Sequence, residues 1–235
     1  MDGTPFTRVS TGRISADIVD QIKVAIRDGR LAPGDQLPPE RDLTKQLGVS
    51  RVSVRDALRM LEATGLIEVR VGARGGAFVT VPAPQLVSEG LADMLMLAET
   101  TPAEVTEARR IFELGMLELA CERRTDDDLA ALEQICDRAD TALAGGTYDT
   151  AISAEFHTRL ARCAHNTAIA LFAEIFQGPL LRSLQQARKV DPQMGRVGAL
   201  EHRAIVDALR ARDPKAAKEI LSTHLGRTAQ RVADT

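Results

Sequence analysis

The feature that most constrains this chain is the stretch from Leu37 to Leu66, which reads LPPERDLTKQLGVSRVSVRDALRMLEATGL. It predicts two short helices, one from about Pro39 to Leu47 and one that begins after Ser50. Ser50 is a favourable N-cap because its hydroxyl accepts a hydrogen bond from the free N–H groups of the first turn. In the second helix, apolar residues recur at i, i+3, i+4 and i+7 and predict one buried face: Val54, Ala57, Leu58 and Leu61.

Three arginines, Arg51, Arg55 and Arg59, follow a different stripe of the second helix at i, i+4 and i+8. A short helix that is packed on one side and carries guanidinium groups on another fits the DNA major groove. The first helix adds Arg41 at its exposed start. We therefore interpret the stretch as a helix-turn-helix, and an ordinary helical hairpin with a solvated basic face is the alternative.

The residues around this stretch favour the DNA-binding interpretation. A helix is expected before it, from Ser15 to Arg27. After it, Ile67, Val69 and Val71 alternate with charged residues, which predicts a strand, and residues 77–81 predict a second strand. The turn between them, GARGG at 72–76, lets the backbone at Gly72 approach a sugar-phosphate chain closely. A hairpin at this place makes a winged helix, although a plain hairpin loop has the same pattern.

The remainder of the chain predicts an all-α second domain. Pro82-Ala83-Pro84 is a stiff linker that divides a domain at 1–81 from a domain at 82–235. Aromatic residues make up 3% and Trp is absent, so the cores consist of small and aliphatic side chains, which favours helices. The predicted fold class is mainly α, with Gly145-Gly146 and Gly178-Pro179 as breaks or kinks. About seven helices are expected after the linker: 85–98, 102–124, 126–144, 148–164, 167–188, 196–212 and 214–232.

Charge and composition restrict the function classes only weakly. The net charge of −3 by itself argues against a nucleic-acid partner. Residues 1–81, however, hold 12 Lys and Arg against 10 Asp and Glu, so their net charge is +2. The three cysteines form no Cys-x-x-Cys pair and are expected to be small buried hydrophobes in a reducing compartment. No stretch is long and apolar enough to cross a bilayer, which predicts a soluble, cytoplasmic protein.

Four polar residues of the second domain occupy positions in apolar helical stripes: Arg109, His157, His202 and His224. A buried guanidinium needs an anion. Imidazoles that converge inside a bundle suggest a divalent transition metal such as Zn, Ni, Co or Mn. Each histidine taken singly is better explained as a satisfied core residue than as a metal ligand, and Arg109 taken singly could pair with a buried glutamate such as Glu113.

From about Ser15 to Thr228 the chain resembles the GntR family of bacterial transcription regulators, in the FadR subgroup with a C-terminal FCD domain. The stretches that carry the resemblance are LAPGDQLPPERDLTKQLGVSRVSVRDALRMLEATGLIEVR, RIFELGMLELACERRTDDDLAAL, EFHTRLARCAHN and EHRAIVDALRARDPKAAKEILSTHL. The resemblance implies two sets of functional residues. DNA contacts would come from Arg41, Ser50, Arg51, Ser53, Arg55 and Gly72. The FCD domain would bind an effector carboxylate at Arg109 and a metal at His157, His202 and His224.

The chain departs from the subgroup's pattern at Ser153, where the family usually has Asp four residues before the first metal-binding histidine. A serine hydroxyl is a poor metal ligand, so a metal-free pocket that holds a carboxylate directly is an alternative.

The expected function is therefore a DNA-binding regulator and not an enzyme. It would bind a palindromic operator as a homodimer and respond to a small organic acid, with a divalent metal as possible cofactor. Two competing hypotheses remain open: a metal-dependent hydrolase with a three-histidine site, and a DNA-binding protein with a vestigial pocket.

Overall fold

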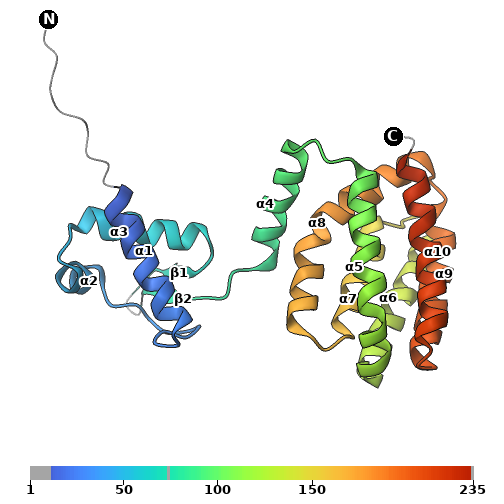
Figure 1. The fold of residues 1–235 in the computed structure, drawn as a ribbon, viewed down its shortest axis with the longest axis horizontal. Coiled ribbons are helices and arrows are strands. Elements are labelled where there is room, and N and C mark those ends of the chain that lie inside the picture. The colour runs from blue at the N-terminus through green and yellow to red at the C-terminus, as the bar shows by residue number, and fades with distance from the viewer. Residues whose placement is uncertain (1–11, 73–74, 234–235) are drawn as a thin grey trace, which may run out of the picture. The chain divides into compact units, whose positions relative to one another are not determined.

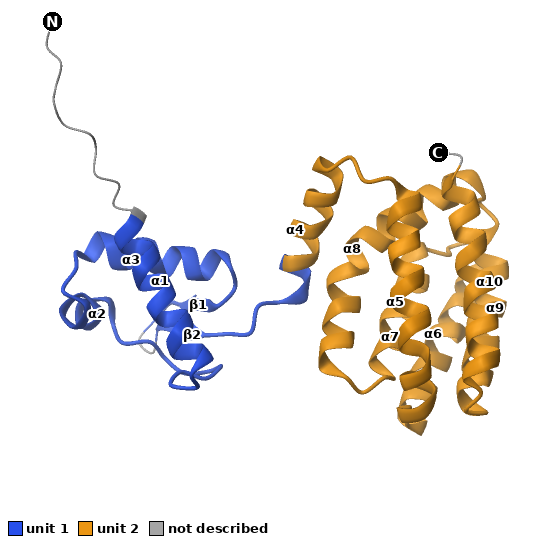
Figure 2. Ribbon diagram, viewed as in Figure 1, with its two compact units in different colours: residues 1–86 blue, residues 87–235 orange. Residues whose placement is uncertain are grey.

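The structure is a computed structural model that describes residues 12–72 and 75–233. It divides into two compact units, residues 1–86 and residues 87–235 (Figure 2). Ala73 and Arg74 of the predicted wing turn lie outside the described residues. The first unit contains three helices and a hairpin (Figure 1): α1 Gly12–Arg27, α2 Glu40–Leu47, α3 Arg51–Ala63, β1 Ile67–Arg70 and β2 Gly76–Val79.

In the first unit, α1 and α2 pack against α3. Gly48 ends α2 in the left-handed conformation, with φ of 66°, which a glycine adopts without strain. This sharp end turns the chain into α3. The predicted apolar stripe of α3 forms the centre of the core, and full burial of such a side chain contributes about 1.5–3 kcal/mol. The buried apolar residues are Ile18, Val19, Ile22, Leu37, Leu43, Val54, Ala57, Leu58, Leu61, Ile67 and Val79.

The two strands form an antiparallel hairpin in which Ile67 pairs with Val79 and Arg70 with Gly76. Only the base of the hairpin contributes to the core. Val69 is 49% exposed, and Val71 lies beyond the strand and is fully exposed. The alternation of apolar residues at 67, 69 and 71 therefore marks the strand correctly but does not mark a buried face, because the hairpin tip has no core beneath it.

The second unit contains seven helices within the described residues (Figure 1). They are α4 Pro84–Leu97, α5 Pro102–Arg123, α6 Asp126–Ala144, α7 Thr150–Arg162, α8 Thr167–Val190, α9 Met194–Arg210 and α10 Pro214–Ala233. Thr101 and Thr125 open α5 and α6 with reciprocal capping boxes. The main core lies among α5, α6, α7, α9 and α10. The prediction of a mainly α chain is confirmed.

Helix α8 continues through Gly178-Pro179 instead of ending there. The backbone N–H of Gly178 donates to the Ser88 hydroxyl of α4 across 3.0 Å. A Cβ atom at Gly178 would lie 2.7 Å from that hydroxyl. The glycine therefore permits the close approach of α4 to α8, which the sequence alone does not reveal.

The three cysteines are free and buried. Burial raises the pKa of Cys136 to about 11 and that of Cys163 to about 12, so these thiols stay protonated and unreactive at neutral pH. Within the described ranges, no helix combines the length and apolar content that a membrane span requires.

Candidate functional site

The start of α3 has the geometry that the sequence predicts. The hydroxyl of Ser50 accepts from the backbone N–H of Ser53 across 3.1 Å, so Ser50 is the N-cap. Ser53 itself is only 4% exposed, and its hydroxyl lies 3.0 Å from that of Ser50. Arg51 begins the helix on the exposed side and has no ion-pair partner among the residues that the structure describes. Ser53 therefore supports the helix start from inside, while Ser50 and Arg51 face outward.

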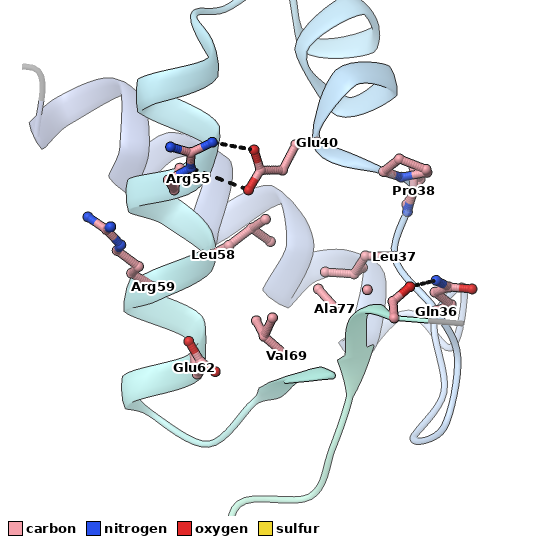
Figure 3. Close-up of a pocket in the computed structure, with 13 residues that line it drawn as sticks. Gln36, Leu37, Pro38, Glu40, Arg55, Leu58, Arg59, Glu62, Val69 and Ala77 are labelled. Atoms are coloured by element: carbon pink, nitrogen blue, oxygen red, sulfur yellow. Dashed lines mark hydrogen bonds and ion pairs between the residues drawn. The ribbon is translucent and has the colours of Figure 1, made fainter. Parts of the chain in front are cut away.

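Arg55, one turn further along α3, is paired. Its Nη2 lies 3.1 Å from Oε2 of Glu40 and its Nε lies 3.5 Å from Oε1, so the carboxylate engages the Nε–Nη2 edge of the guanidinium (Figure 3). The Glu40 carboxylate raises the pKa of Arg55, which keeps the cation charged. Glu40 is absent from the sequence-based set of DNA-interface residues. Glu40 lies 15 residues before Arg55 and on another helix, so no local periodicity connects the two residues.

The other predicted DNA contacts lie on the exposed surface of the same unit. The Arg41 side chain is 70% exposed near the start of α2 and lies 3.3 Å from Asp42. Gly72, at the end of β1, has φ of 116°, a conformation that favours glycine. Its carbonyl accepts from the Gly75 N–H across 2.9 Å and closes the turn.

The three predicted metal ligands converge from three helices. Nε2 of His157 on α7 lies 3.2 Å from Nε2 of His202 on α9 and 3.2 Å from Nε2 of His224 on α10. One nitrogen of each ring lies within 4.8 Å of those of the other two. All three side chains are at most 6% exposed. The ring of Phe156 stacks on His202 with 4.0 Å between ring centroids, which fixes that imidazole.

Two carboxylates hold the outer nitrogens of this cluster. Nδ1 of His157 lies 2.7 Å from Oε2 of Glu113, and Nδ1 of His224 lies 2.9 Å from Oε2 of Glu201. A carboxylate accepts a hydrogen bond from the protonated Nδ1, so the lone pair of each ring is left on Nε2. No pattern in the sequence pointed to Glu201, although this residue directly precedes His202.

The histidines are neutral at physiological pH. Burial, together with the positive charge of Arg109, lowers the pKa of His157 to about 4 and that of His224 to about 3. Burial and the two neighbouring histidines lower the pKa of His202 well below its ordinary value. Neutral imidazole nitrogen is the form that binds metal ions.

Arg109 lies beside the cluster and is only 2% exposed. Its Nε donates to Oε1 of Glu113 across 2.5 Å, which confirms the partner that the sequence suggested. Its two terminal nitrogens, Nη1 and Nη2, are buried with no hydrogen-bond partner within the described structure. Two unsatisfied donors on a buried cation are energetically costly, so these two nitrogens are chemically suited to an anionic acceptor.

Ser153 lies one turn before His157 on α7 and is 6% exposed. It lines a small cavity with Tyr148, Glu201, His224 and Arg227, and Arg227 forms an ion pair with Glu201. The neutral hydroxyl of Ser153 does not replace the carboxylate of the family pattern.

The donor set fits a divalent transition metal. Two ligand nitrogens bonded at about 2.0–2.1 Å lie about 2.9–3.4 Å apart, for angles between octahedral and tetrahedral, and the observed separations of 3.2 Å fall inside this range. Two Nε2 lone pairs that face each other repel unless a cation lies between them. Three neutral imidazoles, two with carboxylate partners, are typical ligands for Zn, Ni, Co or Mn.

A winged helix joined to a helical domain with a buried polar site defines the class of two-domain, DNA-binding transcription regulators. The family model "FCD domain" matches residues 104–227, and the model "Bacterial regulatory proteins, gntR family" matches residues 14–79. This chain belongs to the GntR family and carries an FCD domain.

Named relatives support this assignment along nearly the whole chain. The HTH-type transcriptional repressor NanR of Cronobacter sakazakii is 33% identical over 221 residues, which cover 91% of this chain and 83% of that protein. The Uxu operon transcriptional regulator of Escherichia coli is 31% identical over 210 residues, which cover 86% and 80%. A solved structure, Streptococcus agalactiae GntR, shares the fold with a TM-score of 0.68 and 24% identity, covering 92% of this chain and 99% of that one.

The comparisons confirm several predictions made from the sequence. The chain is a transcription regulator that binds DNA, and it is not an enzyme, because the family and the named relatives are regulators. The three-histidine hydrolase hypothesis therefore loses its support.

Proposed function

We propose that this protein is a ligand-responsive transcription regulator whose operator affinity is set by a small carboxylate bound in the FCD domain, next to a divalent metal. The observation that carries the proposal is the position of the Arg109 guanidinium, which shares the Glu113 carboxylate with His157 of the three-histidine cluster and has both terminal nitrogens unpaired. A buried guanidinium cation with unsatisfied N–H donors favours the binding of an anionic ligand.

His157, His202 and His224 would hold the metal, which when bound supplies a Lewis-acidic centre for a carboxylate oxygen. Glu113 orients His157 and also anchors Arg109, so that one carboxylate positions both a metal ligand and the effector-binding arginine. Arg109 would then bind the effector carboxylate through Nη1 and Nη2 in the bidentate geometry that guanidinium groups favour. Ser153 supplies no carboxylate ligand, so the effector or water would complete the set of metal ligands.

The winged helix supplies the operator contacts in this proposal. Arg51 and Arg55 would read base edges from α3, Ser50 and Arg41 would contact the backbone, and Gly72 would approach it from the wing. Ser53 belongs to the interface through the Ser50 hydroxyl that it positions. One recognition helix reads few base pairs, so a homodimer on a palindromic operator is the arrangement that yields a specific site.

For the effector to change operator affinity, it must bind one state of the protein better than another. Helix α4 directly follows the Pro82–Pro84 linker and contacts α8 through Ser88. It therefore connects the DNA-binding unit to the bundle and is the coupling element in our proposal.

The proposal is tested with an operator fragment taken from the DNA upstream of the protein's own gene. Its affinity for the metal-loaded protein is titrated with a panel of small organic acids at fixed salt, and the same acids are tested in thermal melts. At least one acid should raise the melting temperature and change the affinity, and Arg109→Ala should abolish both effects. An acid that raises the melting temperature while affinity stays constant would contradict the coupling. If no acid raised the melting temperature, the pocket would be vestigial.

A further inference from the structure

We propose that Glu40 determines the specificity of the DNA interface by holding the Arg55 guanidinium in one orientation, so that Arg55 discriminates between bases. The inference rests on the proposed role of Arg55 as a base-reading residue. In this scheme Glu40 is a positioning residue, because it acts through Arg55 and does not itself bind DNA.

The geometry of the pair leaves one edge of the guanidinium free. Arg55 carries five N–H donors, and Glu40 takes Nε with one carboxylate oxygen and Nη2 with the other (Figure 3). The remaining donors, on Nη1 and the outer side of Nη2, form a two-pronged edge. Such an edge matches O6 and N7 of guanine in the major groove. A guanidinium fixed on one side by a carboxylate is thus oriented for guanine on its other side.

Glu40 is itself well anchored. It begins α2 directly after Pro38-Pro39, where the positive end of the helix dipole favours a carboxylate. Its carbonyl accepts from the Thr44 hydroxyl across 2.7 Å, which closes the first turn. Its carboxylate and Arg55 both lie on the wall of a cavity of about 290 Å³ between α3, the start of α2 and the hairpin (Figure 3).

Stability does not account for a carboxylate at this place. The side chains of Arg55 and Glu40 are 57% and 39% exposed, and exposed ion pairs contribute about 0–1 kcal/mol. A negative charge on a DNA-binding surface also repels phosphate and weakens binding to every sequence. Because Glu40 adds little stability and weakens binding to every DNA sequence, we attribute its presence to discrimination between bases.

The neighbouring arginines of α3 are held differently. Arg59 lies 3.9 Å from Asp56, a single long contact, and Arg51 has no ion-pair partner in the described part of the chain. Arg55 is therefore the member of the arginine stripe whose orientation the protein itself fixes before DNA arrives.

The test compares Glu40→Gln with the wild type and with Glu62→Gln as matched control. Glu62 is an exposed glutamate of α3 on the wall of the same cavity, so its replacement removes the same charge from the same unit. Each full-length protein selects sites from a random double-stranded DNA library, and its affinity for the wild-type consensus and for random DNA is measured at fixed salt. Thermal melts check that the variants fold.

We expect Glu40→Gln to lose the guanine preference at one position per half-site. A well-formed arginine–guanine pair supplies about 5- to 150-fold discrimination, and on the order of fivefold should be lost. Affinity for random DNA should rise, as repulsion of phosphate is relieved. Glu62→Gln should show the same rise in affinity for random DNA but should keep the guanine preference. The inference fails if Glu40→Gln retains the wild-type preference, or if both variants lose it equally.

Arg55→Ala separates failure of this inference from failure of the proposed function. If Arg55→Ala abolishes the guanine preference while Glu40→Gln keeps it, Arg55 reads a base without help from Glu40 and only the present inference is wrong. If Arg55→Ala leaves every position of the consensus unchanged, Arg55 does not read bases, and the proposed contact and this inference both fall.

Discussion

Nε2 of His157 lies 3.2 Å from Nε2 of His224, and each ring donates a hydrogen bond from Nδ1–H to a carboxylate. Both Nε2 atoms therefore present lone pairs to each other in a buried site. A cation between them would relieve this repulsion, and the third histidine, His202, would complete a set of three nitrogen ligands.

Arg109 and Glu113 should be energetically coupled, because each compensates the buried charge of the other. Arg109→Met leaves an uncompensated carboxylate and should reduce the free energy of unfolding by about 3–5 kcal/mol. Glu113→Gln should destabilise by a similar amount. The double variant should lose less than the sum of the single losses, as measured by urea unfolding. Strictly additive losses would show that the two side chains act independently.

Replacement of Ser153 by Asp should strengthen metal binding. Ser153 lies on the same face of α7 as His157, one turn earlier, and lines a cavity with His224. A carboxylate there attracts a dication, which should raise affinity by at least about tenfold. Competition with a chromophoric chelator measures the change. Ser153→Asn controls for size without charge, and equal affinities of the Asp and Asn variants would refute the prediction.

Arg51→Ala should weaken binding to the cognate operator more than binding to random DNA. The side chain is exposed at the first residue of α3 and has no ion pair to break within the described chain. Loss of a base contact costs about 1–3 kcal/mol of discrimination. Fluorescence anisotropy with both DNAs measures this, with Arg30→Ala, beyond the end of α1, as control. Equal losses on the two DNAs would mean that Arg51 contacts only phosphate.

Asp128 should stabilise the bundle in a pH-dependent manner. Burial raises its pKa, but hydrogen bonds from Thr125 and His165, with the charge of Arg159, outweigh burial and lower the pKa overall. A carboxyl whose pKa is lower in the folded state binds more protons when unfolded, so its contribution is lost on acidification.

The stability difference between wild type and Asp128→Asn should therefore be full at pH 7. It should shrink as pH falls below the ordinary aspartate pKa of 3.8. Urea unfolding across this pH range measures the difference, which should be about 1–3 kcal/mol at neutral pH. Asp127→Asn, an exposed neighbour on the same turn, should show little effect. A difference for Asp128→Asn that does not change with pH would contradict the assignment.

The fold could be predicted in detail because its determinants are local. The 3.6-residue period of Val54, Ala57, Leu58 and Leu61 marks the buried face of α3, and the same stripe forms the core. The Ser50 cap could be predicted from one residue type at one position. Exposure was less predictable: Ser53 is buried by packing of α3, and Val69 is exposed because the hairpin projects beyond the core.

The site could be predicted only as a set of inward-facing residues. Periodicity places His157, His202 and His224 on the inner faces of their helices, but their convergence depends on how three helices pack. Glu201 and Glu40 could not be assigned at all, because their partners lie on other helices, 23 and 15 residues away. Long-range pairs of this kind are fixed by tertiary packing and leave no periodic signal in the sequence.

The central claim, that the three histidines hold a divalent metal, is tested most directly by elemental analysis of the purified full-length protein after dialysis against metal-free buffer. The prediction is about one equivalent of a divalent transition metal per chain, bound by the folded site. His202→Ala should lose most of this metal and its thermal stabilisation, while His165→Ala, which lies outside the cluster, should keep both. Wild-type protein that contains no metal, and that gains neither bound metal nor melting temperature after addition of Zn²⁺, Ni²⁺, Co²⁺ or Mn²⁺, would contradict the account.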